Sequence, residues 1–225
     1  MNNIIVILAG GKGSRYNIST PKQYDLVNGK ELIEYSISEM LKSKSVDKIL
    51  VVLDNDPTNM ERIKKKFDVE VTCGGDSRAS SFQNAIDFVS WKYGGCKKIV
   101  FHEAARPLIK SSIIDEYFHL LDEYDYVESC KRINDSLGSY VVEAPRREDY
   151  YLIQAPEAYR FSILTQYFDY KSDIYFAANQ FPVFVKGYQY FDIPFNIKLT
   201  TQEDKVLVEY LLKHMNDAEA EWYCE

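Results

Sequence analysis

The sequence lacks three features that would each assign it to a definite class of protein. It has no apolar run long enough to span a membrane, and the run near its start, Ile4–Leu8, has no basic segment before it. We therefore expect neither a membrane segment nor a signal peptide. It also lacks an excess of basic residues, since 34 acidic against 27 basic side chains give a net charge of −7, which argues against a general nucleic-acid binder. Its four cysteines are scattered without a C-x-x-C pair, so neither a disulfide framework nor a zinc site is expected. These absences predict a cytoplasmic protein with no nucleic-acid or membrane partner.

What the sequence does contain is the alternation typical of an α/β protein. Its 225 residues, 46% of them hydrophobic, suffice for one domain, which we place at residues 1–225. Strand and helix candidates alternate through the first half: strands at 4–8, 48–53, 70–73 and 98–102, and helices at 31–43, 59–67, 80–91 and 112–123. This order predicts a mostly parallel sheet with helices on both faces, and ligands at the carboxyl ends of its strands.

The alternation breaks between residues 125 and 161. Short strand-like pieces at 140–142 and 150–154 are separated by Pro145 and Pro156, a pattern that favours an extended arm leaving the main sheet.

Beyond this arm the chain is predicted to return to the sheet. Strands are expected at 183–186 and 196–199. Thr200–Thr201 with Glu203 are expected to cap a last helix that ends near His214. The polar tail from residue 216 is expected to be frayed.

A glycine-rich segment directly follows the first predicted strand. It reads Leu8-Ala9-Gly10-Gly11-Lys12-Gly13-Ser14-Arg15, and Lys22 follows seven residues later. Three glycines let backbone N–H groups approach an anion closely, and Arg15 and Lys22 add positive charge beside them. The spacing fits neither a P-loop nor a dinucleotide-binding fingerprint. The segment therefore indicates a polyphosphate cradle of another kind, and the alternative is a glycine-rich turn that binds nothing.

Four further polar clusters follow predicted elements, and each has a purely structural alternative. Gly74–Arg78 suits contacts to a base or ribose, or simply the N-cap of a helix. His102–Pro107 places an acid near an arginine, which suits a ribose or metal contact or a structural ion pair. Arg146-Arg147 suits a phosphate monoester or a solvated basic pair. Asn196–Thr201 carries Lys198, which faces either a cleft or solvent.

In this order, the glycine loop and the four clusters resemble a family of cytidylyltransferases that make CDP-activated alcohols. The family comprises the 2-C-methyl-D-erythritol 4-phosphate cytidylyltransferases of isoprenoid synthesis and the ribitol-5-phosphate and related polyol-phosphate enzymes of cell-surface polymers. The likeness extends from Ile4 to about Leu212, and L-A-G-G-x-G-S-R, P-K-Q, A-A-R-P and N-I-K-x-T are specific as a set.

The resemblance implies a Rossmann-like α/β nucleotidyltransferase fold with a mostly parallel twisted sheet and a protruding β-arm at about residues 132–160. It implies a homodimer that exchanges these arms, and Mg²⁺ bridging the triphosphate. It also assigns residue roles. Catalytic roles fall to Arg15, Lys22 and Lys198. CTP binding falls to Leu8, Ala9, Gly10, Gly11, Gly13, Gly75, Asp76, Ser81, Glu103 and Ala104. Acceptor binding falls to Arg106, Ser136, Arg147 and Asp173, and Glu103 is also a candidate metal ligand.

The chain departs from the family pattern mainly at acceptor positions. Glu103 stands where the family usually has aspartate, and Asp135–Gly138 lacks the usual lysine. Gln154–Glu157 ends in an acid where the family has glutamine. These departures predict that CTP is kept as the donor of CMP while the acceptor is a different polyol phosphate, such as ribitol 5-phosphate or glycerol phosphate, for surface polysaccharide or teichoic-acid-type polymer synthesis.

Three alternatives remain open. The chain could instead be a 2-C-methyl-D-erythritol 4-phosphate cytidylyltransferase, or a nucleotide-binding protein that has lost catalysis. It could also be a sugar-1-phosphate nucleotidyltransferase, whose loop begins in the same way, although the A-A-R-P and N-I-K-x-T segments weigh against this.

Overall fold

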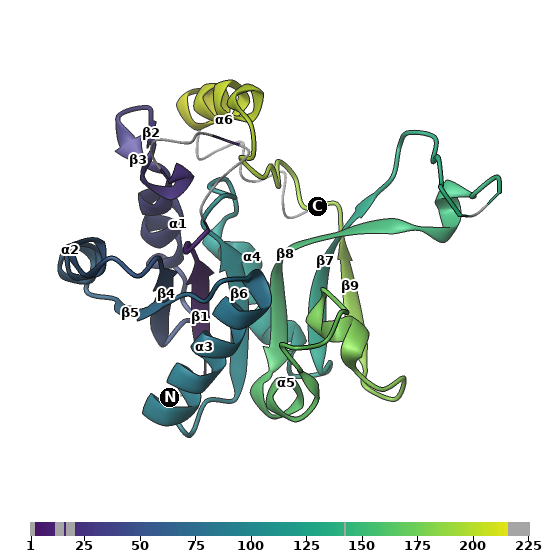
Figure 1. The fold of residues 1–225 in the computed structure, drawn as a ribbon, viewed down its shortest axis with the longest axis horizontal. Helices are drawn as coiled ribbons and strands as arrows, with labels where there is room; N and C mark the ends of the chain where they lie inside the picture. The colour runs from purple at the N-terminus through teal and green to yellow at the C-terminus, as the bar shows by residue number, and fades with distance from the viewer. Residues whose placement is uncertain (1–2, 12–15, 17–20, 142, 216–225) are drawn as a thin grey trace.

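A seven-stranded sheet runs through the molecule and carries helices on both of its faces (Figure 1). The computed structural model describes residues 3–11, 16, 21–141 and 143–215. The strands lie in the order β5-β4-β1-β6-β8-β7-β9. Their bounds are β1 Asn3–Leu8, β4 Lys48–Leu53, β5 Glu70–Cys73, β6 Lys98–Glu103, β7 Tyr126–Arg132, β8 Tyr151–Arg160 and β9 Gly187–Phe191. Strands β5, β4, β1 and β6 pair in parallel, β8 runs antiparallel to β6 and β7, and β9 is parallel to β7. The sheet is therefore mostly parallel, as predicted.

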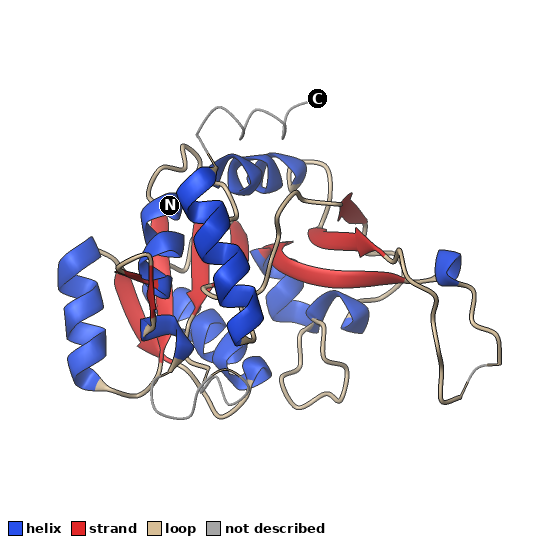
Figure 2. Cartoon of the chain, turned by 90° about the horizontal axis from the view of Figure 1, so that it is seen from above, coloured by secondary structure: helices blue, strands red, loops and turns tan. Residues whose placement is uncertain are grey.

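The alternation of side chains along β1 divides the main core between the two faces of the sheet. Ile5 and Ile7 pack with α1, α2 and α4, whereas Ile4 and Val6 pack with α3 and α5. The helix bounds are α1 Leu32–Met40, α2 Pro57–Phe67, α3 Arg78–Lys92, α4 Ser111–Leu120 and α5 Phe161–Tyr167. Figure 2 shows these helices on either side of the strands. All four helices and four strands predicted for the first half are present, with small shifts at their ends.

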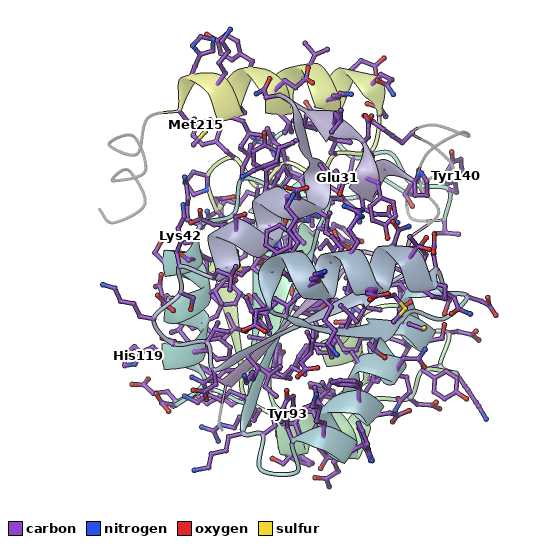
Figure 3. All side chains as sticks on the ribbon, turned by 90° about the vertical axis from the view of Figure 1, so that its left-hand side faces the viewer. Glu31, Lys42, Tyr93, His119, Tyr140 and Met215 are labelled. Carbon is purple, nitrogen blue, oxygen red and sulfur yellow. The ribbon has the colours of Figure 1, made fainter. Side chains whose placement is uncertain are left out.

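The last helix, α6 Gln202–His214, lies across a short hairpin formed by β2 Leu26–Val27 and β3 Lys30–Glu31 (Figure 3). A small third core joins them, in which Val27, Leu199 and Val208 are fully buried. The predicted cap is half correct. Thr201 is the N-cap, but its reciprocal partner is Asp204 at the third helical position and not Glu203, because a capping box requires that spacing.

Two of the strands predicted for the second half are wrong. Residues 183–186 form a turn, in which the Val185 amide donates to the Pro182 carbonyl at 2.9 Å. Residues 196–199 are extended but irregular, and the Leu199 amide donates to the Ala105 carbonyl at 2.8 Å. The strands that follow the arm in the sheet are instead β8 and β9. Their pairing with distant segments has no strong local signature, so apolar alternation alone misplaced them.

Strand β8 is longer than predicted and continues through Pro156. The pairing register with β7 shifts at this point, since Glu128 lies opposite Glu157 whereas Ser129 lies opposite Gln154. A bulge leaves residues unpaired, so the missing N–H of a proline is tolerated there. The irregularity thus explains why a proline did not end the strand.

Residues 133–150, between β7 and β8, project beyond the sheet as a long excursion (Figure 1). It corresponds to the first part of the arm predicted at 132–160, while β8 returns to the sheet and pairs with β6 from Glu157 onward. The strand-like piece predicted at 140–142 is irregular at Tyr140 and Val141, and Val142 lies outside the described residues, as does the tail from residue 216. No helix within the described ranges is long and apolar enough to cross a bilayer.

Candidate active site

A pocket of about 350 Å³ opens where β1, β5 and β6 end. The carboxyl ends of adjacent parallel strands meet at one edge of a sheet, which is where open α/β sheets bind ligands. Sixteen residues line it: Leu8, Ala9, Gly10, Gly11, Lys22, Gln23, Leu32, Gly75, Asp76, Ser77, Arg78, Ser81, Glu103, Ala104, Ala105 and Lys198. The fold thus gathers segments from both ends of the described chain into one site.

Glycines let the backbone of neighbouring loops approach closely at this edge. A Cβ built on Gly10 would stand 3.1 Å from the Leu53 carbonyl oxygen. A Cβ on Gly75 would stand 2.6 Å from the Cβ of Ser80, at the start of α3. Side chains at these positions would push the loops apart, so the close approach requires glycine.

The N-terminus of α3 borders the pocket. Ser77 is its N-cap and forms a capping box with Ser80, which fixes where the helix begins. The Ser81 hydroxyl accepts from the Gly75 amide at 3.0 Å and donates to the Ser77 carbonyl at 2.8 Å. These contacts hold Gly75-Asp76 beside the positive end of the helix dipole, which favours an anionic ligand.

Glu103 stands at the end of β6 inside a cluster of cations. Its carboxylate accepts from Lys198 Nζ at 2.9 Å and from Arg106 Nε at 3.1 Å, and Arg78 Nε lies at 3.7 Å. Burial alone would raise the pKa of Glu103, but Arg106, Lys198 and Arg78 outweigh it and lower the pKa to about 2. Glu103 is therefore ionised at neutral pH and holds Lys198 at the mouth of the pocket.

This depressed pKa predicts a pH-dependent stabilisation. The unfolded carboxyl has an ordinary pKa of 4.5 and the folded one about 2. The ionised form therefore stabilises the fold above pH 4.5, and the contribution is lost as the pH falls toward 2. We expect the difference in unfolding free energy between wild type and Glu103→Gln, measured in urea, to be about 3 kcal/mol at pH 6.5 and clearly smaller at pH 3. A difference that is the same at both pH values would contradict this assignment.

Arg78 joins this pocket to a second one. Its guanidinium forms an ion pair with Glu157, whose side chain is completely buried, and lies 5.4 Å from the ring centres of both Phe82 and Tyr175. The Tyr159 hydroxyl donates to the other oxygen of Glu157. Burial alone would lower the pKa of Arg78, but Glu157 and Glu103 outweigh it and raise it. Arg78 is thus a fixed positive charge at the junction of the two pockets.

The second pocket, of about 390 Å³, lies between the base of the arm and the loop after α5. It shares Arg78, Glu103 and Lys198 with the first, and its further lining is Arg106, Tyr151, Leu152, Ile153, Gln154, Ala155, Tyr175, Phe176 and Asn179. A second small molecule bound here would lie next to a nucleotide in the first pocket.

The surroundings of Glu103 do not fit a metal ligand. Both carboxylate oxygens already accept from cationic side chains, and a divalent ion would have to displace them or sit against three positive charges. Hard cations prefer several oxygen ligands, and no group of three or more His, Cys, Asp or Glu side chains suited to a metal occurs among the residues described. Glu103 is better explained as the counter-ion of Lys198, Arg106 and Arg78.

Most of the nucleotide-binding residues predicted from the sequence lie together. Lys22 and Lys198 line the first pocket, with nine of the predicted CTP-binding residues: Leu8, Ala9, Gly10, Gly11, Gly75, Asp76, Ser81, Glu103 and Ala104. Arg15 and Gly13 lie outside the described residues. Arg106 faces the second pocket and donates to the backbone and side-chain oxygens of Asn196, both at 3.0 Å.

The other predicted acceptor residues are not brought to either pocket within this chain. Ser136 is exposed in the excursion between β7 and β8. Arg147 lies further along it, where it donates to the Asn134 carbonyl and pairs with Glu148. Asp173 is exposed in the loop after α5. Their predicted roles stay predictions.

Five residues that line the first pocket were not assigned a role from the sequence, and Gln23 and Arg78 are the two among them with long polar side chains. Both belong to motifs that were noticed there, P-K-Q and G-G-D-S-R. The role of Arg78 depends on its ion pair with Glu157, which lies 79 positions away in the sequence and so gives no local signal. Gln23 is recognisable only from its burial.

Comparison with known proteins agrees with this geometry. A family model described as 2-C-methyl-D-erythritol 4-phosphate cytidylyltransferase matches residues 3–214. A protein of that name from Clostridium botulinum is 27% identical over 229 residues, covering 95% of this chain and 98% of the relative. A bifunctional ribulose 5-phosphate reductase/CDP-ribitol pyrophosphorylase from Haemophilus influenzae is 30% identical over 178 residues, which cover 74% of this chain but 37% of the relative.

Solved structures show the same fold. The 4-diphosphocytidyl-2C-methyl-D-erythritol synthase of Anaerococcus prevotii has a TM-score of 0.78 at 20% identity, covering 95% of this chain and 99% of the other. The 2-C-methyl-D-erythritol 4-phosphate cytidylyltransferase of Thermus thermophilus has a TM-score of 0.74 at 19% identity, covering 95% and 100%. The predicted nucleotidyltransferase fold is confirmed.

Proposed function

Because the chain belongs to the 2-C-methyl-D-erythritol 4-phosphate cytidylyltransferase family, and is thus a cytidylyltransferase of a polyol phosphate, we propose that its acceptor is 2-C-methyl-D-erythritol 4-phosphate. CMP would pass from CTP to this phosphate, and pyrophosphate would be released. The observation that supports the CTP half is the meeting of Ala9–Gly11, Lys22, Gly75-Asp76 and Lys198 in one pocket. The acceptor half is supported by full-length relatives of that name.

The proposed reaction needs alignment and charge neutralisation more than proton transfer. An oxygen of the acceptor phosphate forms a bond to the α-phosphorus of CTP, and the bond from that phosphorus to the bridging β-phosphate oxygen breaks. The acceptor phosphate is already an anion, so no general base is required. The protein must place it in line and stabilise negative charge on the transferring and leaving groups.

Two lysines are placed to supply that charge. Lys22, in the short 3-10 helix η1 Lys22–Tyr24, donates to the Leu199 carbonyl at 3.2 Å, which connects it to the segment that carries Lys198. Lys198 lines both pockets and so stands between a nucleotide and an acceptor. Arg78 adds a third cation at the same junction. Positive charges fixed before the reaction stabilise a phosphoryl transition state without reorganisation.

Mg²⁺ remains a proposal, and we propose that it is held by the phosphate oxygens of CTP and not by Glu103. Mg²⁺ commonly keeps few protein ligands when it binds substrate phosphates. A homodimer is likewise a proposal. It is supported by the projecting excursion at 133–150 and by the exposed apolar side chains of Tyr140 and Val141 on it.

Ribitol 5-phosphate, the type of acceptor expected from the sequence, is the second candidate. The Haemophilus influenzae relative supports it, as do the departures at Gly138 and Glu157. Glu157 does not line the second pocket, but its carboxylate neutralises Arg78, which does, so a glutamine at this position would leave the pocket more positively charged. The full-length relatives nevertheless favour the methylerythritol compound as the leading candidate.

An acceptor panel tests the choice. The protein is incubated with CTP, Mg²⁺ and one of 2-C-methyl-D-erythritol 4-phosphate, ribitol 5-phosphate or glycerol 3-phosphate, and the CDP product is measured by mass spectrometry. We expect the highest kcat/KM with the methylerythritol compound, by at least about tenfold, because a site that hydrogen-bonds one set of hydroxyls leaves polar groups unpaired with another.

Each other outcome has a definite meaning. A higher kcat/KM with ribitol 5-phosphate replaces the leading candidate by the second, and a higher kcat/KM with glycerol 3-phosphate contradicts both. If CTP binds but no acceptor gives pyrophosphate release, the proposed reaction is contradicted. That result would support the alternative of a nucleotide-binding protein without catalysis.

A further inference from the structure

Gln23 is a buried polar side chain whose amide nitrogen has no hydrogen-bond partner. It lies in η1, between Lys22 and Tyr24, and is only 3% exposed. Among the buried side-chain nitrogen and oxygen atoms of the described residues, two lack any hydrogen-bond partner. They are Nε2 of Gln23 and Nδ1 of His102. Gln23 differs from His102 in lining the first pocket.

An unpaired buried amide destabilises a fold by about 1–3 kcal/mol. An apolar side chain of the same length would avoid this penalty. The sequence nevertheless places a donor here, next to the anion-binding edge of the sheet. A buried polar group without a partner calls for an explanation. One explanation is that the group forms its hydrogen bond only when a ligand is bound.

The pocket itself offers few acceptors for this donor. Of its two acidic side chains, Glu103 already accepts from Lys198 and Arg106, and Asp76 is exposed in the loop before α3. The remaining charged lining consists of Lys22, Arg78 and Lys198, which are donors. Because Nε2 of Gln23 has no acceptor among the described residues, a bound ligand can supply one, and the surrounding cations favour an anionic ligand.

We propose that Gln23 is a nucleotide-binding residue whose Nε2 donates a hydrogen bond to a phosphate oxygen of CTP. The proposal rests on the proposed function for the identity of the nucleotide, but not on the acceptor. Gln23 lies directly after Lys22, so one turn supplies both a charge and a directed neutral donor to the same triphosphate. The neutral donor adds orientation, because a lysine acts as a point charge whereas an amide N–H fixes an angle.

The test replaces Gln23 with methionine, which keeps the length and removes the donor. Binding of CTP without acceptor is measured by isothermal titration calorimetry, and the thermal midpoint of the ligand-free protein is measured separately. We expect the Kd for CTP to rise about ten- to hundredfold, the range for losing a hydrogen bond to a charged acceptor. The midpoint of the ligand-free protein should stay the same or rise, because an unpaired buried donor has been removed.

A satisfied glutamine provides the matched control. The side chain of Gln180 accepts from the Asp169 amide at 2.8 Å and donates to the Ile174 carbonyl at 3.0 Å, away from the first pocket. Gln180→Met is expected to show the opposite pattern, with a lower thermal midpoint and an unchanged Kd for CTP. Gln23→Glu supplies a second variant, in which a carboxylate faces the triphosphate and is expected to weaken binding more than methionine does.

The outcomes separate this inference from the function on which it rests. If wild type does not bind CTP, the proposed function fails. If wild type binds CTP and Gln23→Met binds it equally well, the role of Gln23 is wrong while the function stands. A lower thermal midpoint in Gln23→Met assigns the amide to the fold and also overturns the proposal.

Discussion

Replacing Lys198 with methionine is expected to lower kcat by about 10²-fold or more, the loss seen when one preorganised donor is removed from a transition-state site. Lys198 lines both pockets and is held 2.9 Å from Glu103. A positive charge at this junction acts on the α-phosphoryl group that is transferred from CTP to the acceptor. Loss of the charge should therefore affect kcat more than the KM for CTP. The measurement is steady-state pyrophosphate release with CTP and the best acceptor of the panel.

Folding should survive this change, which makes the kinetic result interpretable. Glu103 keeps Arg106 at 3.1 Å and Arg78 at 3.7 Å when Lys198 is removed, so its charge is still compensated. The matched control is Lys205→Met. Lys205 is similarly paired, at 2.7 Å from Asp25, but belongs to α6 and lines neither pocket. Turnover of Lys198→Met within threefold of wild type would contradict the role of this lysine.

The second large effect is expected on stability. Arg78→Met removes the cation that compensates Glu157, whose side chain has no solvent exposure. Breaking a buried ion pair by deleting one partner typically destabilises a protein by about 3–5 kcal/mol, because the other charge is left uncompensated. We expect a loss of that size in the free energy of unfolding in urea at pH 7, with an unchanged m value.

The double variant Arg78→Met/Glu157→Met is the diagnostic control. Removing both charges leaves no uncompensated group, so the double variant should be more stable than Arg78→Met alone. If the double variant is as unstable as the sum of the two single variants, the two side chains do not interact. A loss below about 1 kcal/mol for Arg78→Met would correspond to an exposed pair and not to a buried one.

The nucleotide half of the site could be predicted because its parts are short and contiguous. Ala9–Gly11 directly follow β1, and Gly75-Asp76 follow β5 after Gly74; both strands were predicted from the sequence. Parallel strands bring their carboxyl ends to one edge, so position in the sequence translates into position in the pocket. Lys198 was also identified, although the strand expected around it is an irregular segment.

The acceptor half could not be predicted in the same way, because its parts meet only through long-range pairing. The second pocket lies between the base of the arm and the loop after α5, and Tyr151 and Tyr175 come together there from separate elements. Strand β8 supplies Tyr151–Ala155 to this pocket, and its pairing partner β7 was not recognised from the sequence. Apolar alternation at 183–186 suggested a strand where the chain makes a turn.

By itself, the sequence determined the order of strands and helices in the first half. It also predicted a glycine-rich polyphosphate segment and most of the charged residues that line the first pocket. These depend on local periodicity, on glycine at close approaches and on motifs at strand ends. Only the tertiary structure decided that Arg78 is neutralised by a buried Glu157 and that both carboxylate oxygens of Glu103 accept from cationic side chains. It alone also showed that the Gln23 amide nitrogen is buried without a hydrogen-bond acceptor. Each of these depends on burial and on partners far away in the chain, because the strength of a charge or a hydrogen bond is set by what surrounds it in space.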